Sequence, residues 1–216
     1  MPHLLTEKPS VINQYLAELR DEAVQQDRAR FRNNLRRIAK FAGYEISKTL
    51  AYEPASITTP LGIANTELSN DRVVIATILR AGLPMYEGLL EVFDQADSAF
   101  ASAYRKHNKD GSFDINMPYL TCPSLDGSVL ILADPMIATG ASIHSCLLAM
   151  EDHGTPKSIH VVTAIASVEA VAFLKRRHSK LHVWAAAVDE ELTAKSYIVP
   201  GLGDAGDLAY GPKLQE

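Results

Sequence analysis

The sequence predicts an α/β protein with a mostly parallel central sheet flanked by helices, and two observations carry this prediction. Continuous apolar runs of strand length recur at residues 73–79, 128–133, 158–165 and 181–188. Such runs are typical of strands buried on both faces of a parallel sheet. The first three runs lead through short segments into apolar residues at helical spacing, and this alternation favours a parallel sheet. Ligands of such sheets bind at the carboxyl ends of the strands.

Composition limits the class of protein and its compartment. A length of 216 residues and a hydrophobic fraction of 47% suggest a single domain, residues 1–216, with a substantial core. The net charge of −5 and the pI of about 5.8 disfavour a dedicated nucleic-acid or anionic-membrane binder. We find no signal-peptide pattern, no membrane-length apolar stretch and no metal-type cysteine spacing, so we expect a cytoplasmic protein. The seven histidines do not cluster, so no protein-built metal site is expected.

Two helices are predicted in the N-terminal region, residues 1–45. The first covers residues 10–20 and the second residues 26–42, where apolar positions repeat at helical spacing. The other face of the second helix is basic and carries Arg28, Arg30, Arg32, Arg36, Arg37 and Lys40. The favoured interpretation is a solvated face, and the alternative is a phosphate-facing or dimer-facing role for one of these arginines. Residues 58–62 are expected to form a loop or strand edge.

The strand at residues 73–79 runs directly into Arg80, and a helix with Met85, Leu89 and Phe93 on one face follows. An arginine at the carboxyl end of a buried strand needs a partner, and its planar fork of donors matches phosphate oxygens. The alternative is an ion pair between Arg80 and a structural carboxylate.

Residues 99–120 form a candidate β-arm. Residues 101–104 alternate weakly, residues 105–111 are polar, and this polar stretch ends in Asp110-Gly111, a hairpin signal between β-like segments. Two interpretations compete, a flexible flap and an exposed strand pair used for dimer contacts.

The strand at residues 128–133 opens into residues 134–142, which are short, polar and turn-rich, and a helix containing Ile143, Cys146 and Met150 follows. Small or hydroxylic residues enter that helix, so its backbone N–H groups and positive end can hold an anion. Asp134 would repel a phosphate but can accept hydrogen bonds from sugar hydroxyls. The alternative is an ordinary β–α turn with a serine N-cap. Neither a Walker motif nor a Gly-x-Gly-x-x-Gly fingerprint is present at this loop.

The last part of the chain adds a helix at Val168–Arg177, the strand at residues 181–188 and a closing region of about residues 189–211. Within that region, residues 197–207 contain three glycines and a proline. This composition predicts a structured loop that is neither helix nor strand and that brings bare backbone against a ligand.

These segments resemble the type I phosphoribosyltransferases, and one indicates the uracil phosphoribosyltransferase family. Residues 134–142, Asp-Pro-Met-Ile-Ala-Thr-Gly-Ala-Ser, resemble the ribose-5-phosphate loop, and residues 78–82, Ile-Leu-Arg-Ala-Gly, resemble the pyrophosphate loop. Tyr104-Arg105 is similar to the Tyr-Arg at the base of the family's arm. Residues 197–207, Tyr-Ile-Val-Pro-Gly-Leu-Gly-Asp-Ala-Gly-Asp, are nearly diagnostic of the uracil family. The resemblance spans roughly residues 70–211.

The chain departs from the family pattern at two places. Where the family typically reads Ala-Pro-Glu-Gly, residues 166–170 read Ala-Ser-Val-Glu-Ala, so no role is carried onto that loop. Residues 114–119 also differ from the expected pattern, which leaves the conformation of the arm open.

The resemblance implies a type I phosphoribosyltransferase-like fold with a β-hairpin arm and a C-terminal base-binding loop. It implies pyrimidine salvage, in which uracil and 5-phosphoribosyl 1-diphosphate (PRPP) give UMP and diphosphate, with Mg²⁺ carried by PRPP and no metal ligand from the protein. The implied catalytic residues are Asp134 and Arg80. The implied PRPP contacts are Arg80, Arg105, Asp134, Pro135, Met136, Ile137, Ala138, Thr139, Gly140, Ala141, Ser142 and Asp204. The implied uracil contacts are Ile198, Gly203, Asp204 and Ala205.

Two alternatives stay open at this point. One is a nucleotide-sensing, RNA-binding regulator with the same fold, for which the basic helix near residue 30 is the only candidate surface, and the acidic total charge weighs against it. The other is the same reaction on another base, such as a purine or orotate. We expect a homodimer or higher homo-oligomer. The sequence does not decide the oligomeric state, activation by a nucleotide such as GTP, or the identity of a general base for uracil N1.

Overall fold

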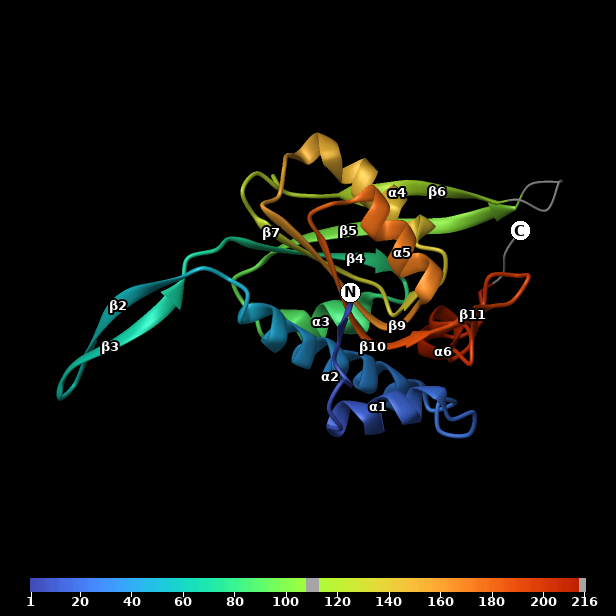
Figure 1. Cartoon of the computed structure of the whole chain (residues 1–216), viewed down its shortest axis with the longest axis horizontal. Coiled ribbons are helices and arrows are strands. Elements are labelled where there is room, and N and C mark those ends of the chain that lie inside the picture. The colour runs from blue at the N-terminus through green and yellow to red at the C-terminus, as the bar shows by residue number, and fades with distance from the viewer. Residues whose placement is uncertain (108–112, 214–216) are drawn as a thin grey trace.

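The structure, a computed structural model, describes residues 1–107 and 113–213, without the side chains of residues 103–117. Its centre is an eight-stranded sheet in the order β1-β10-β9-β7-β4-β5-β6, with β8 paired to β9 (Figure 1). Paired neighbours run parallel except β5 and β6, which are antiparallel. The predicted mostly parallel sheet is confirmed. The strands of this sheet are β1 (His3–Leu4), β4 (Val73–Leu79), β5 (Asp97–His107), β6 (Phe113–Thr121), β7 (Val129–Ala133), β8 (Met136–Ile137), β9 (Ser158–Ser167) and β10 (Leu181–Asp189).

Helices cover both faces of the sheet, and the strands divide their side chains between them. The helices are α1 (Val11–Arg20), α2 (Arg28–Ser47), α3 (Leu83–Leu90), α4 (Ala141–Met150), the 3-10 turn η1 (Glu151–His153), α5 (Val168–Arg177) and α6 (Ala205–Tyr210). In β4, Val73 and Ile75 pack in the core with α1, α2 and α3, whereas Val74 and Ala76 pack with α4 and α5. This alternation follows from the two-residue period of a strand, and burial on both faces explains the continuous apolar runs.

Both helices that the sequence predicts in the N-terminal region are present, and each begins after a side-chain cap. Ser10 caps α1 through a capping box with Asn13, and Asp27 caps α2 by accepting from the N–H groups of Ala29 and Arg30. The second helix continues to Ser47, beyond the expected end at residue 42, because Gly43 and Ile46 remain buried on its inner face.

A β-hairpin was missed by the sequence prediction. Strands β2 (Tyr52–Thr59) and β3 (Gly62–Ser69) pair antiparallel, so residues 58–62 form its turn and the strand ends beside it. The hairpin projects away from the body of the molecule (Figure 1), and nearly all of its residues are exposed. Because both faces of the hairpin are exposed, neither strand needs the alternation of apolar and polar residues by which a half-buried strand is recognised.

The candidate β-arm is a strand pair. Strands β5 and β6 pair antiparallel, with a register irregularity between Ser102 and Tyr104. The Asp110-Gly111 turn signal lies outside the described residues.

The prediction for residues 197–207 was wrong in one respect. The segment contains the short strand β12 (Ile198–Val199), which pairs with β11 (Glu191–Leu192), and the start of the short helix α6. Asp204 caps this helix by accepting from the Asp207 N–H group. A six-residue helix is too short to show a periodic apolar pattern, whereas its aspartate cap is a local signal.

Candidate active site

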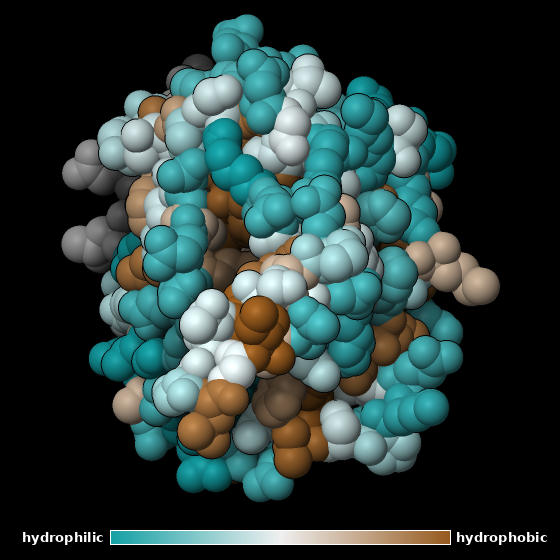
Figure 2. Space-filling view, turned by 90° about the vertical axis from the view of Figure 1, so that its left-hand side faces the viewer, coloured by the Kyte–Doolittle hydropathy of each residue, from teal (hydrophilic) through white to brown (hydrophobic). Residues whose placement is uncertain are grey.

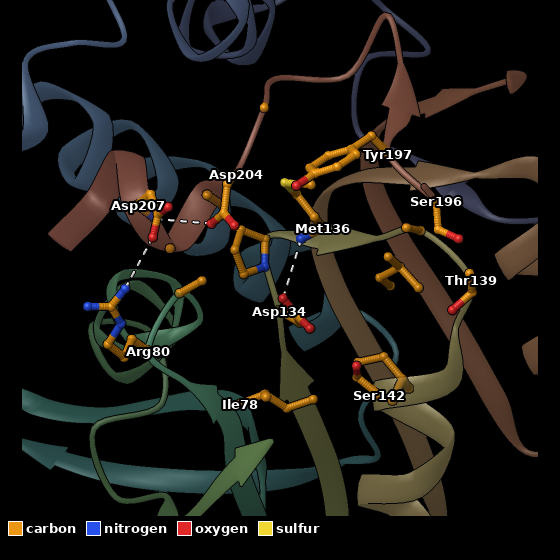
Figure 3. Close-up of a pocket in the computed structure, with 18 of the residues that line it drawn as sticks. Ile78, Arg80, Asp134, Met136, Thr139, Ser142, Ser196, Tyr197, Asp204 and Asp207 are labelled. Atoms are coloured by element: carbon orange, nitrogen blue, oxygen red, sulfur yellow. Dashed lines mark hydrogen bonds and ion pairs between the residues drawn. The ribbon is translucent and has the colours of Figure 1, made fainter. Parts of the chain in front are cut away.

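A cleft of about 980 Å³ lies at the carboxyl ends of β4 and β7, where the sheet topology predicts ligand binding. The segments that follow these two strands line it together with the region between β11 and α6 and the start of α6 (Figure 3). Its lining residues are Ile78, Leu79, Arg80, Ala81, Ser102, Asp134, Pro135, Met136, Ile137, Ala138, Thr139, Gly140, Ser142, Ile143, Ala194, Lys195, Ser196, Tyr197, Gly203, Asp204, Ala205, Gly206, Asp207 and Lys213. We call residues 134–142 the phosphate loop and residues 198–205 the base loop, after the ligands that the sequence predicts.

The phosphate loop ends at a glycine cap. Gly140, not a serine, is the N-cap of α4, so the alternative of a serine-capped β–α turn was wrong, and Ser142 lies inside the first turn facing the cleft. Gly140 has φ of +80°, and a Cβ there would lie 2.9 Å from Cδ1 of Phe173. Only glycine therefore permits this close approach of the loop to α5. The Thr139 hydroxyl accepts a hydrogen bond from the Ala141 N–H group at 3.3 Å.

Ser167 explains one departure from the family pattern. It caps α5 by accepting from the Ala170 N–H group at 2.9 Å, and its hydroxyl donates to the Ala138 carbonyl of the phosphate loop at 2.6 Å. The sequence reasoning assigned no role to this residue. A serine before an apolar helical run is a recognisable cap signal, but its second contact depends on the pairing of β8 with β9.

Asp134 begins the phosphate loop at the end of β7. Its backbone N–H donates to the Val162 carbonyl of β9, and its carboxylate accepts from the Met136 N–H at 3.4 Å. In Figure 3 it lies between Arg80, Asp204 and Asp207 on one side and Thr139 and Ser142 on the other. Burial, together with the charge of Asp134, raises the pKa of the Cys146 thiol to about 12, so Cys146 is a protonated core residue of α4.

Arg80 follows β4 across a cis peptide bond between Leu79 and Arg80. Its Nη2 lies 3.4 Å from an Asp207 carboxylate oxygen and 3.3 Å from the Gly211 carbonyl oxygen. Its side chain is 43% exposed. Arg80 therefore does pair with a carboxylate, as the alternative interpretation proposed. That carboxylate, Asp207, also lines the cleft, so the ion pair keeps Arg80 within the candidate site.

Two carboxylates at the start of α6, Asp204 and Asp207, are paired with Lys213. Lys213 Nζ lies 3.0 Å from Asp204 and 3.6 Å from Asp207. Burial would raise the pKa of the Asp204 carboxyl, but the hydrogen bond from the Asp207 N–H and the Lys213 ammonium hold it below its usual value. Asp204 is therefore ionised at neutral pH.

The cleft brings together most of the residues that the sequence singled out, but not all of them. Ala141 and Ile198 are absent from its described lining, and Ile198 is 5% exposed. The side chain of Arg105 lies outside what the structure describes. The sequence reasoning gave no role to Tyr197 or Asp207, although both stand within the motif at residues 197–207. It also missed Gly206, which stands within the same motif, and Ser102, Ala194, Lys195, Ser196 and Lys213, which lie outside any motif.

Among the residues that the structure describes, no group of three or more His, Cys, Asp or Glu side chains is placed to hold a metal ion. No helix within the same residues is long and apolar enough to cross a bilayer.

The sheet order and the placement of the phosphate loop, the base loop and the segment at residues 78–82 define a type I phosphoribosyltransferase fold. The AQ2163 protein from Aquifex aeolicus has a similar structure, with a TM-score of 0.86 and 29% identity over 100% of both chains. The family model described as uracil phosphoribosyltransferase matches residues 6–212. The chain is 46% identical to the uracil phosphoribosyltransferase of Porphyromonas gingivalis over 206 residues, 95% of each protein. It is 39% identical to that of Pyrococcus furiosus over 207 residues, 94% of this chain and 88% of the relative. The chain belongs to the uracil phosphoribosyltransferase family.

Proposed function

We propose that this protein is a pentosyltransferase that converts uracil and PRPP into UMP and diphosphate for pyrimidine salvage. The observation that carries the proposal is the meeting of three predicted loops in one cleft, each suited to one part of the two substrates. Family membership supports the same reaction. The cytoplasm is the proposed compartment, and the free thiols of Cys122 and Cys146 support it.

The phosphate loop takes the 5-phosphate in this proposal. Residues 138–142 present small side chains, two hydroxyls and the N-terminus of α4 to the cleft, which together favour an anion. The carboxylate of Asp134 then faces the ribose hydroxyls rather than the phosphate. Its negative charge also favours the positive charge that grows on the sugar as the bond from C1 to diphosphate breaks.

Arg80 takes the diphosphate, and Arg105 from the arm joins it by resemblance. The planar guanidinium of Arg80 can hold two oxygens of the leaving group, which gains charge during the reaction. For this the Arg80 head group exchanges its 3.4 Å contact with Asp207 for the substrate. Because that contact is long and half-exposed, the exchange costs little.

The backbone of the base loop reads uracil. Main-chain groups of Ile198, Gly203, Asp204 and Ala205 supply a carbonyl for N3–H and amides for the two uracil oxygens. Gly203 has φ of +95°, and a Cβ there would meet Leu208 only at 3.6 Å, so the backbone faces open space beside the cleft. Asp204 also faces the phosphoribosyl group. No general base is assigned to uracil N1.

Mg²⁺ enters on the oxygens of PRPP and would help to neutralise the leaving diphosphate. The donor set of the cleft fits a cation delivered in this way, because two of the three carboxylates in its described lining, Asp204 and Asp207, are already paired with Lys213. The protein contributes Arg80 to the neutralisation of the same diphosphate charge.

The test is an assay of the purified chain with PRPP, Mg²⁺ and one radiolabelled base at a time, namely uracil, cytosine, hypoxanthine or orotate. Labelled UMP from uracil, with little product from the others, is expected. Preferred turnover of another base would refute uracil as the substrate but retain the phosphoribosyl transfer reaction. No product from any base would refute both assignments. Adding GTP to the same assay measures activation.

Contacts within the chain weaken the regulatory alternative, because they engage several of the basic residues of α2. Arg30 pairs with Glu18, and both Arg36 and Lys40 contact Glu91, so these charges of α2 serve contacts within the chain. Arg32 donates to the Ala209 carbonyl of α6 at 2.7 Å. The enzyme is therefore the better proposal.

We also propose a homodimer, held by the hairpin of β2 and β3. An isolated two-stranded hairpin is marginal in water and needs a packing partner. The hairpin exposes Leu61 fully and Ile63 to 74%, and the side of the molecule that carries it shows hydrophobic patches among polar surface (Figure 2). A second copy of the chain is the proposed partner. Ile63→Lys should shift the species seen by sedimentation toward monomer, and an unchanged distribution would refute this contact.

A further inference from the structure

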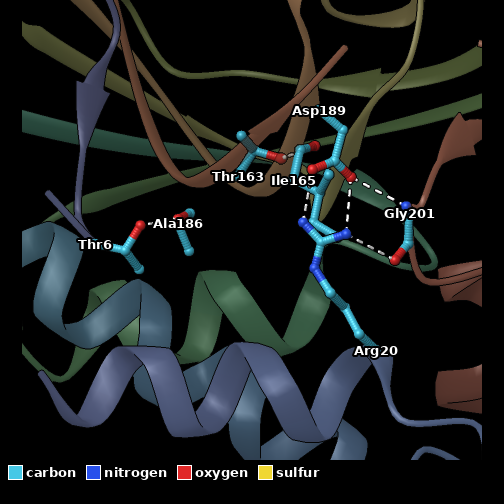
Figure 4. A network of polar contacts seen from close by, with 7 residues as sticks. All are labelled: Thr6, Arg20, Thr163, Ile165, Ala186, Asp189 and Gly201. Atoms are coloured by element: carbon cyan, nitrogen blue, oxygen red, sulfur yellow. Dashed lines mark hydrogen bonds and ion pairs between the residues drawn. The ribbon is translucent and has the colours of Figure 1, made fainter. Parts of the chain in front are cut away.

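An ion pair links the end of α1 to the carboxyl end of β10. Arg20 is the last residue of α1, and Asp189 is the last residue of β10. The guanidinium donates to both carboxylate oxygens, with Nη1 at 2.8 Å and Nη2 at 2.7 Å (Figure 4). Asp189 is 8% exposed and the Arg20 side chain 22%, so this is a largely desolvated, bidentate pair.

The same pair holds the backbone of Gly201 in the base loop from both sides. The Gly201 N–H donates to the Asp189 carboxylate at 3.0 Å, and the Gly201 carbonyl accepts from Arg20 Nη1 at 3.1 Å. Figure 4 shows these contacts meeting at one point between α1, β10 and the loop. The peptide groups on both sides of residue 201 are therefore fixed by one ion pair.

Gly201 cannot be replaced without loss of this arrangement. Its φ is +60°, and a Cβ there would lie 2.1 Å from the Ile198 carbonyl oxygen. The chain thus folds tightly back on itself between β12 and residue 203, and the ion pair closes that fold. Gln25 extends the contact, since its amide, oriented to satisfy both of its polar atoms, donates to the Leu202 carbonyl at 2.8 Å.

We infer that Arg20 and Asp189 are positioning residues that set the backbone of the base loop for uracil. The inference rests on the proposed function, in which Gly203 and its neighbours read the base with main-chain groups. Gly201 stands two residues before Gly203, so a rotation of its peptide groups moves the reading groups directly. Displacements of about 1 Å at such contacts are enough to cost about a hundredfold in rate.

The experiment compares Arg20→Lys and Asp189→Asn with variants of a second ion pair of α1, the one between Glu18 of α1 and Arg30 of α2. Lysine keeps the charge but not the fork, and asparagine keeps the shape but not the charge. Arg30→Lys and Glu18→Gln are the controls, because Arg30 also forms a two-point contact with Glu18, at 2.8 and 2.7 Å, away from the base loop. Each variant is assayed for the KM of uracil, the KM of PRPP and the ratio of uracil to cytosine turnover, alongside a thermal melt.

In Arg20→Lys and Asp189→Asn the KM of uracil should rise about tenfold or more, and base discrimination should fall. The KM of PRPP should change less than about threefold, and the controls should change neither KM by more than that. If Asp189→Asn fails to fold, Arg20→Lys decides. Equal changes in both KM values, or a control that reproduces the uracil effect, would overturn the positioning role alone. No turnover by the wild type would instead overturn the proposed function.

Discussion

The phosphate loop and the base loop line the same cleft, but they are held in place by different parts of the chain. The phosphate loop leaves β7 and enters α4 directly, and Ser167, 29 residues from Ala138, supports it from the adjacent strand. The base loop depends on Arg20, which contacts Gly201 across 181 residues, and on Asp189 at the end of β10. One loop is thus set by local structure, and the other by closure of the whole fold.

This difference matters for what each loop recognises. An anion is bound by charge and by several N–H groups, and it tolerates small shifts. A planar base is bound by directional hydrogen bonds, which weaken steeply with distance and angle. The loop with the stricter geometric task is the one fixed by a buried ion pair.

Base discrimination is the largest effect that we predict. Uracil presents an N3–H donor between two carbonyl acceptors, whereas cytosine has an acceptor at N3 and an amino donor at C4, which reverses two of the three groups. Each mismatch costs about 1–3 kcal/mol, so kcat/KM should favour uracil by about a hundredfold to several thousandfold. Comparable turnover of cytosine by the wild type would refute reading of the base by the backbone.

Two variants locate this discrimination within the base loop. Gly203→Val should block uracil binding, because a branched side chain is strained at a φ of +95° and would fill the open space beside the cleft where the base binds. Side-chain changes at the buried Ile198 should weaken uracil use without admitting cytosine. A specificity switch in the Ile198 variants would show that side chains read the base.

Asp134→Asn tests the phosphate loop. The change keeps the shape but removes the charge that favours the cationic sugar, so kcat/KM should fall about a hundredfold or more. Asp126→Asn is a control, because Asp126 serves a turn at Thr155 and does not line the cleft. Activity of Asp134→Asn within about threefold of the wild type would remove Asp134 from the mechanism.

Arg80 lies beside Asp207 at α6, so variants of Arg80 show which substrate this side of the cleft holds. Arg80→Lys loses the fork for diphosphate and should raise the KM of PRPP about tenfold, with a smaller change for uracil. The same result is expected for Arg105→Lys. Arg72→Lys is the control, because Arg72 precedes the opposite end of β4 and pairs with Asp97. An effect confined to uracil would mean that Arg80 serves the base loop.

The difference between the loops also explains how much of the site the sequence could predict. The phosphate loop and Arg80 were found because a buried strand, a turn and a helix lie next to one another in the chain. Local sequence patterns contain no signal for Arg20 and Asp189, because neither lies in a recognisable motif. They are 169 residues apart in the sequence and meet only in the folded chain. Lys213 was missed for the same reason.

The fold shows the same limit in its strands. Those of the sheet core, such as β4 and β7, were predicted because burial on both faces gives them continuous apolar sequences. The exposed strands β2 and β3 have no such pattern, and only their turn was noticed. A solvent-exposed strand places few constraints on its sequence, whereas a strand buried in the core requires apolar residues that the sequence displays.

The smallest effect on activity is expected at His160, which lies on β9 between the strands that lead to the two loops. Burial, followed by the neighbouring His182 and His3, lowers the pKa of His160 to about 4. The neutral ring accepts a hydrogen bond from Trp184 Nε1 at its Nδ1, at 3.0 Å. Below a pH of about 6.5 the unfolded chain gains a proton here that the folded chain refuses until about pH 4. The free energy of unfolding therefore falls as the pH drops through this window.

His160→Asn separates this effect from catalysis. Asparagine keeps an acceptor for Trp184 but does not titrate, so the wild type should lose about 3 kcal/mol more stability than the variant between about pH 7 and pH 4. Urea unfolding at several pH values gives the change of the free energy of unfolding with pH for the wild type and for the variant. These two slopes are compared, and not the absolute stabilities, because the smaller side chain also leaves a cavity. Both KM values should stay within about twofold at neutral pH, because His160 does not line the cleft. Equal slopes would show that His160 is protonated normally in the folded chain, and a selective change in the KM of uracil would show that β9 also helps to set the base loop.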